Sequence, residues 1–517
     1  MYFAHQMNCS SLRKGILGLS LLVNLPVLYE APLIAQFIFE QRLNELWILW
    51  GSGFGLAFGL VFIAPLWKNI PADTENGFHL FRYEGTAARG LYYFRAVFLG
   101  LIIVPLIATL NLHSFATLFS IGSGITQSVV MIIVCGALIC TTTLNTMERR
   151  FRMDSIVGIL STAAVAFLAL FWLFEPAETN KFVQNPGVQS LFPENSMSMI
   201  MVFGFHWMLT GIFDFPDMEG QKLLHARKKG TMKQFLLLIL LMMVSQVFIY
   251  ILGLKAVVNN SIVGNSVKGE ELLGNFVAQH PLSLRVIFLG LLFFSFISVL
   301  KNLQLWCGQL LQPILSKQMK HRSHLPGMII FGVALAFWSF NTTGLWSVAR
   351  YLLIISAGVG PVFLLRWYWS RITAGVQWIA MVSALVIGNV YEFLYGYSHC
   401  IATAIDSFSK HIGLSLYLTE VLICGVLTTI IWLISAMLIS PTSDAKWQLF
   451  QSSTGALKQL RNVNNWILFF LLSALLLATK NLAWQLGKSG PWHIALFIWL
   501  LLVLLIWYTQ RFSLKKN

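Results

Sequence analysis

The chain has 517 residues, of which 57% are hydrophobic and only 11% are charged, and it contains 40 Phe and 18 Trp. Soluble domains carry about 25% charged residues, so this composition excludes a soluble multidomain enzyme. Repeated apolar runs of about 20 residues predict instead an all-α polytopic membrane protein. Six cysteines form no CxxC pair, and we expect them to be small packing residues, with no metal site and no cofactor.

We predict about 14 transmembrane segments. In chain order they cover 15–39, 45–66, 91–112, 117–141, 153–175, 196–213, 234–257, 284–315, 327–341, 346–368, 372–394, 414–440, 463–485 and 492–510. A polar stretch at 440–465 precedes the last two segments, and the longer connections are expected to be loops or short surface helices.

The net charge of +15 is distributed unevenly along the chain. The chain ends and the even-numbered loops carry 24 Lys and Arg, against 5 in the odd-numbered loops. By the positive-inside rule this asymmetry predicts that both termini are cytoplasmic, which an even number of spans allows. The basic excess therefore concerns orientation in the membrane, and nucleic-acid binding is excluded.

Two of the predicted helices contain features that interrupt a helix. The first carries Pro26 and Pro32 on either side of Glu30, and the sixth carries Gly204 and Gly211. Interrupted first and sixth helices are typical of an inverted five-plus-five repeat with a binding site at the middle of the membrane. Ordinary proline kinks in packed helices are the alternative.

Lys301 is the charged residue that the hydrophobic environment least favours. It lies about 15 residues, roughly 22 Å, from the cytoplasmic end of its predicted helix. A lysine at that depth costs about 3 kcal/mol or more unless it faces a partner or water. Ser298 lies three residues earlier on the same face, and Glu30 is the best candidate counter-charge. The alternative is a Lys–Glu pair that only joins two helices.

Three other polar or aromatic features have ordinary explanations. His206, beside Trp207, is expected to be a hydrogen-bonded packing residue or a proton carrier. Arg350 and Glu392 lie near predicted helix ends, where long side chains reach toward the interface. The Trp and Tyr residues at 367–369 are typical of an interfacial aromatic belt.

Several stretches together resemble the sodium:solute symporter family, and they follow one another in order between about 16 and 460. The run at 357–371 resembles the family's tenth core helix, which is Gly-rich and closes in W-x-R. The segment at 219–228 is similar to Gln-Arg-x-x-Ala-Ala-Lys after the sixth core helix. The segment at 81–85 resembles the E-x-R-Y-G entry to the third helix, and that at 30–33 a D-T-P-L version of the unwound first helix in one bacterial subgroup.

This resemblance implies a LeuT-type core of ten helices in two inverted halves, at 15–175 and 196–368, followed by additional C-terminal helices at 372–510. It implies a symporter in the inner membrane of a bacterium, with the solute bound near Glu30, His206, Trp207 and Thr210. Possible partners are the solute, the lipid bilayer and a protein subunit.

The family's sodium site is altered in this chain. It uses carbonyls of the broken first helix and two adjacent hydroxyls in the eighth helix, where alignment on Trp306 places Ser298 and Val299. Sodium is a hard cation that needs several oxygen ligands, and two like charges 4 Å apart repel by about 4 kcal/mol at an effective dielectric near 20. The Lys301 ammonium would therefore replace sodium and pair with Glu30, so that coupling is to protons or is absent.

Three functions remain open. A secondary active transporter of a small polar organic solute explains the broken helices and the buried lysine together. A non-transporting sensor or a membrane scaffold subunit of the same descent would also tolerate the loss of a hydroxyl ligand. An integral-membrane enzyme with His206 as base is disfavoured, because the nearest acid, Asp214, lies about two turns away.

Overall fold

The computed structural model describes a large part of the chain. It covers residues 27–40, 57–70, 75–141, 200–211, 269–315, 325–341 and 344–487, with short stretches at 53–55, 156–160 and 256–257 and the single residues 163, 198 and 253. The predicted span at 492–510 and most of those at 153–175 and 234–257 lie outside the described residues, as do Asp214 and the segment at 219–228.

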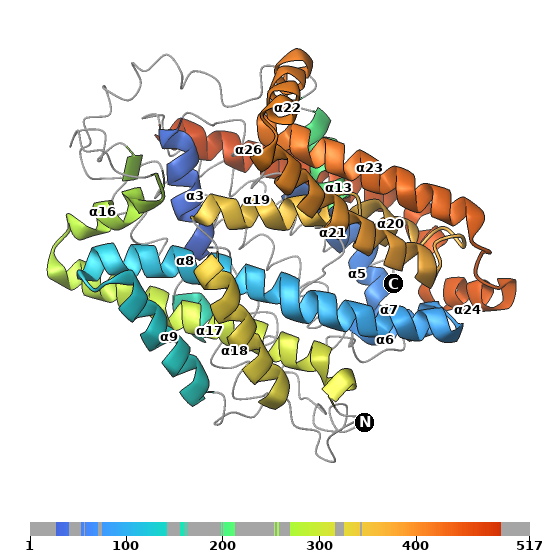
Figure 1. The fold of residues 1–517 in the computed structure, drawn as a ribbon, viewed down its shortest axis with the longest axis horizontal. Helices are drawn as coiled ribbons and strands as arrows, with labels where there is room; N and C mark the ends of the chain where they lie inside the picture. The colour runs from blue at the N-terminus through green and yellow to red at the C-terminus, as the bar shows by residue number, and fades with distance from the viewer. Residues whose placement is uncertain are drawn as a thin grey trace.

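Every regular element in this part of the chain is helical (Figure 1). The first helices are α3 (Val27–Phe39), η2 (Gly59–Ile63), α5 (Ala64–Lys68), α6 (Glu75–Arg82), α7 (Gly85–Phe98), η3 (Leu99–Ile103), α8 (Val104–Ser123), α9 (Gln127–Thr141), η5 (Met201–Phe205) and α13 (His206–Thr210). They are followed by η7 (Gly269–Glu271), α16 (Leu272–Ala278), α17 (Leu282–Leu315), α18 (Leu325–Asn341), α19 (Leu345–Ser356), α20 (Gly360–Leu365), α21 (Ala374–Tyr397), α22 (His399–Ile412), α23 (Leu416–Leu438), α24 (Asp444–Thr454), α25 (Ala456–Arg461) and α26 (Val463–Gly487).

Four of the described helices are long and apolar enough to cross a membrane. They are the continuous helix Gly85–Ser123, Leu282–Leu311, Ala374–Tyr397 and Leu416–Leu438. The outer faces of the bundle are apolar: on α18, Ile329, Val333 and Phe337 are spaced four apart and are 60%, 67% and 59% exposed. Such an exposed apolar stripe is unfavourable in water and favourable against lipid, so the chain is an integral membrane protein.

One long helix, formed by α7, η3 and α8, crosses the bundle (Figure 1). We predicted two segments here, 91–112 and 117–141, and this boundary was wrong. The helix continues to Ser123 and ends at Gly124, which has a φ of +76°. The polar residues Asn111 and Ser114, near the predicted boundary, lie buried inside the bundle. A polar face turned inward is ordinary in a membrane helix that packs on neighbours over its whole length.

The π-helical turn η3 has an identifiable cause. Pro105 lies just after it and has no N–H, so the carbonyl four residues earlier, on Leu101, loses its usual helical donor. The indole Nε1 of Trp338, on α18, donates to that carbonyl at 3.2 Å. A neighbouring helix therefore supplies the donor that the Leu101 carbonyl lacks, and a carbonyl in the membrane interior needs such a partner.

The sixth and tenth predicted segments are both interrupted, and they meet at their interruptions. α13 ends at Gly211, with a φ of +75°, as the glycine pattern predicts. The segment at 346–368, which we predicted as one span, is divided at 357–359 into α19 and α20. Gly358, with a φ of +86°, donates its N–H to the Leu209 carbonyl at 3.0 Å. Gly360 lies directly against Met208 and Gly211, so only glycine permits this backbone contact.

At the other end of α20, a buried arginine joins three elements. The Arg82 guanidinium, at the end of α6, donates to the carbonyls of Arg366, Trp369 and Ile372 and to the Thr442 hydroxyl, at 3.0–3.3 Å. It also lies over the Trp447 and Phe450 rings of α24. Five N–H donors in one plane make arginine suited to such a junction, because several carbonyls can be satisfied at once.

Trp367 does not belong to the aromatic belt that we predicted at 367–369. Trp367 is fully buried, with its ring 5.4 Å from Trp67 and 5.0 Å from Phe78. The neighbouring Arg366 is also buried, with its guanidinium 4.4 Å from the Phe78 ring. These side chains fill the junction between α6 and α24 instead of facing the interface. The cation–π contact between Arg366 and Phe78 is more stabilising there because water is excluded.

Candidate functional site

Glu30 lies in the first turn of α3 and is buried, with 6% exposed. Pro32 is inside the same helix, at its sixth residue, so the Leu28 carbonyl loses its usual helical donor while the helix continues through Glu30 and Pro32. The predicted interruption around Pro26 precedes the described residues. α3 packs against η7, α8 and α16, so the carboxylate is held among helices and not at the surface.

The sixth segment presents His206, Trp207 and Thr210 from a single short helix. A π-helical turn at Met201–Phe205 precedes α13, which begins at His206. The Thr210 hydroxyl donates to the His206 carbonyl at 2.9 Å. This bond satisfies the hydroxyl within the helix itself, which is common for threonine in apolar helices.

His206 and Trp207 contact different neighbours although they are adjacent in sequence. The His206 ring is buried, and its Nε2 lies 3.0 Å from the Tyr417 hydroxyl of α23. The Trp207 ring lies 5.4 Å from Phe58, in the helical stretch just before η2. α13 therefore lies between α23 and the helical stretch that contains Phe58, with one side chain toward each.

Ser298 and Lys301 lie in the middle of α17. Ser298 is buried and Lys301 is half-buried, and their spacing of three places them on one face. Val299, at the position where the resemblance implies a second hydroxyl, is also buried. α17 packs against α8, and α3 packs against α8 as well. The structure thus places the two predicted charges on helices that share a neighbour, and the pair between Glu30 and Lys301 stays a prediction.

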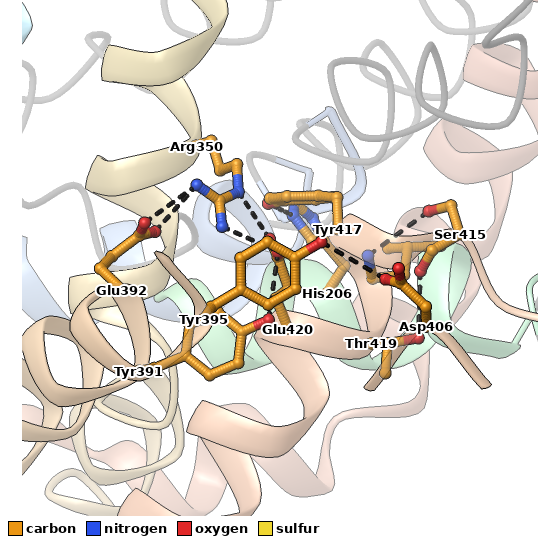
Figure 2. A network of polar contacts seen from close by, with 11 residues as sticks. His206, Arg350, Tyr391, Glu392, Tyr395, Asp406, Ser415, Tyr417, Thr419 and Glu420 are labelled. Carbon is orange, nitrogen blue, oxygen red and sulfur yellow. Dashed lines mark hydrogen bonds and ion pairs between the residues drawn. The ribbon is translucent and has the colours of Figure 1, made fainter. Parts of the chain in front are cut away.

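The structure assembles a charged cluster that we did not predict (Figure 2). Arg350, on α19, binds Glu420 of α23 through two nitrogens, Nε to Oε2 at 2.7 Å and Nη2 to Oε1 at 2.8 Å. Its third nitrogen, Nη1, lies 2.9 Å from Oε1 of Glu392 on α21. Glu420 is fully buried and also accepts from the Tyr391 hydroxyl at 3.2 Å.

Arg350 and Glu392, which we expected to reach toward the interface, pair with each other and keep 21% and 30% of their side chains exposed. A carboxylate and a guanidinium stabilise each other where water is scarce, and the bidentate pair of Arg350 with Glu420 satisfies both groups geometrically. The sequence carried one signal of this cluster that we did not use. Three apolar segments each carry a charged residue near an odd-numbered loop, namely Arg350, Glu392 and Glu420. Tyr417 lies three residues before Glu420 on the same face of α23, so the cluster and the His206 contact adjoin (Figure 2).

Comparison with known proteins identifies the fold. No family model and no curated protein matches the chain. The structure is similar to a Na⁺-coupled sialic acid symporter in a substrate-bound outward-open state, with a TM-score of 0.60 and 12% identity over 86% of this chain and 95% of that one. It is also similar to Mhp1, a nucleobase-cation-symport-1 family transporter in a closed conformation with bromovinylhydantoin bound, with a TM-score of 0.50 and 12% identity over 85% of this chain and 96% of that one. The chain therefore has the LeuT-type fold that these transporters share.

Proposed function

We propose that the protein is a secondary active transporter that moves a small polar organic solute by alternating access. The observation that carries this proposal is the meeting of two interrupted helices inside a LeuT-type fold, where Gly358 bonds to the Leu209 carbonyl. Interrupted helices leave backbone groups that can bind a solute at the middle of the membrane. Both similar structures are transporters, which favours transport over catalysis.

The proposed solute site consists of Glu30, His206, Trp207 and Thr210, at the interface of the halves 15–175 and 196–368, with 372–510 as additional helices. The motifs at 81–85 and 357–371 support a divergent member of the sodium:solute symporter family, with both termini in the cytoplasm of a bacterial inner membrane. His206 and Thr210 already have partners in the structure, so we infer that solute binding exchanges the Tyr417 bond for one to the solute.

For coupling we propose that the Lys301 ammonium stands where related transporters bind sodium, with Ser298 and Glu30 as its neighbours. Lys301 is half-buried on α17 and Val299 supplies no oxygen. A desolvated lysine releases its proton more readily than one in water, so protonation and deprotonation of Lys301 would replace ion binding and release. The transporter is then sodium-independent, and is driven by protons or facilitates diffusion.

The test uses purified full-length protein in liposomes. A panel of amino acids, sugars and carboxylates is screened for binding and uptake, with and without sodium and at two pH values. We expect uptake of one class of solute that is insensitive to sodium and is abolished in Lys301→Ala. The control is Lys410→Ala, because Lys410 is an exposed lysine on α22 and its removal should leave uptake unchanged.

Two results would overturn the proposal at different points. Strict sodium dependence of wild-type uptake would show that Lys301 does not replace the ion. Binding without uptake of any solute by a well-folded protein would favour the sensor or scaffold, and a co-purifying subunit would then be expected.

A further inference from the structure

The first half of α26 presents an apolar stripe away from the bundle. One face of this helix packs inward, with the Trp466 ring 4.7 Å from Phe62. The residues of another face are spaced as on one side of a helix and are 48–68% exposed, namely Val463, Ile467, Phe470 and Leu471. An exposed apolar stripe of this kind is favourable against hydrocarbon and unfavourable in water. The chain therefore enters the apolar layer of the membrane at Val463.

The segment just before this entry is fixed in place. Gly455, with a φ of +65°, turns the chain from α24 into α25. The Asn465 side-chain amide donates to the Gln459 carbonyl at 3.0 Å, and the Trp466 indole donates to the Leu460 carbonyl at 2.9 Å. α25 is thus joined to the first turn of α26, so its outward side chains are preorganised for a ligand instead of being ordered by it.

The exposed side chains of α25 are one leucine and two bases. Leu457 is 40% exposed, and Lys458 and Arg461 are both exposed. Their spacing of three residues places the two bases on one face of the helix. Among the residues that the structure describes, neither base has an ion-pair partner. The acidic Glu84 and Asp444 lie at the start of α24, its far end from α25, so α25 carries a local positive charge beside an apolar surface.

This positive charge lies at the depth of the lipid headgroups. The headgroup layer extends about 5–7 Å beyond the hydrocarbon core on each side of a bilayer. Arg461 precedes Val463 by two residues, so its Cα lies within about 8 Å of the apolar boundary, and Lys458 precedes Arg461 by one helical turn. Long basic side chains at this depth reach the phosphate groups while their aliphatic stems cover apolar surface, and a guanidinium binds a phosphate in a bidentate manner.

We propose that α25 and the start of α26 form a binding site for an anionic phospholipid, with Arg461 and Lys458 on the headgroup phosphate and Leu457 and Val463 against its acyl chains. The headgroup of phosphatidylglycerol leaves the phosphate charge available to both bases, whereas the choline of phosphatidylcholine neutralises it. Each base at an anionic surface contributes about fivefold to binding, so the two together contribute about 30-fold. The site does not require the protein to move a solute and is independent of the proposed function.

The test uses purified full-length protein in liposomes of phosphatidylcholine that contain a trace of phosphatidylglycerol with a photoactivatable acyl chain. After illumination the protein is digested with pepsin, and mass spectrometry measures the lipid adducts on the peptides that cover 456–467, relative to adducts on the rest of the protein. We expect these peptides to be enriched over the labelling obtained with a phosphatidylcholine probe that carries the same acyl chains.

Variants of the two bases separate charge from packing. Lys458→Gln and Arg461→Gln should each reduce labelling by the phosphatidylglycerol probe about fivefold, and the double variant should reduce it about 30-fold. Lys458→Arg keeps the charge and should keep the labelling. The control is Lys410→Gln, which removes one exposed positive charge on α22 and should leave the labelling of 456–467 unchanged. Because both bases are exposed, all these variants should melt at the wild-type temperature.

Three results would overturn the proposal. They are equal labelling of 456–467 by the two lipid probes, a double variant that keeps the wild-type labelling, and displacement of the lipid by inorganic phosphate at constant ionic strength. The last result would indicate a site for a soluble anion instead of a lipid. None of these measurements needs a transported solute, so failure here is distinct from failure of the proposed function.

Discussion

Gly360 begins α20 directly against the last turn of α13, and replacing it with alanine tests how closely these two segments meet. A Cβ at this position would overlap the Met208 carbonyl oxygen and would lie 2.6 Å from the nitrogen and 2.9 Å from the Cα of Gly211. All three are backbone atoms, so no side-chain rotation can relieve the overlap.

The cost follows from these distances. Added methyl groups in packed cores cost about 1–3 kcal/mol when side chains can move aside. Here α13 and α20 must separate, which also weakens the bond from Gly358 to the Leu209 carbonyl, worth about 1 kcal/mol. We therefore expect Gly360→Ala to destabilise the protein by about 3 kcal/mol or more, which is more than a hundredfold in the folding equilibrium.

Thermal unfolding in detergent, followed with a thiol-reactive fluorogenic dye, measures this change, because Cys307 and Cys424 are buried and react only on unfolding. The control is Gly290→Ala in the first third of α17, where a Cβ meets no atom within 4 Å and alanine gains up to about 1 kcal/mol in helix propensity. If Gly360→Ala melted at or above the wild-type temperature, the close backbone contact would be refuted.

Three further predictions concern contacts outside this crossing. Tyr417→Phe removes the hydroxyl partner of His206 and should lower the free energy of unfolding by about 1 kcal/mol, measured in the same melting assay. An unchanged melting temperature would contradict the hydrogen bond. Arg82→Ala removes three hydrogen bonds from α6 to the segment at 366–372 and one to the Thr442 hydroxyl. It should cost about 3 kcal/mol or more, and Arg82→Lys should recover only part of this stability because lysine cannot satisfy several carbonyls at once. Hydrogen bonds from Ser443 hold the pKa of Glu84 below its ordinary value. The stability from this contact is thus present at neutral pH and is lost as the pH falls through the lowered pKa, so Glu84→Gln should reduce the dependence of the melting temperature on acid pH.

The hydropathy pattern alone located most of the helices in the described part of the chain. The predicted spans at 284–315, 372–394 and 414–440 correspond to α17, α21 and α23 within three residues at each end. Long apolar runs determine such helices because a backbone in lipid must satisfy its hydrogen bonds internally. The boundary at 113–116 failed because polar residues at 109–114 face the inside of the bundle, and hydropathy does not distinguish an inward polar face from a connection.

The sequence by itself determined the class of protein, the orientation expected from its basic residues, and the interrupted sixth helix, because composition and glycine spacing are local properties. Only the tertiary structure decided which charges meet. Glu392 and Glu420 follow Arg350 by 42 and 70 positions in the chain. Each of these three residues by itself is typical of a residue at the membrane interface. The folded bundle brings the ends of α19, α21 and α23 together, and there Arg350 pairs with both carboxylates.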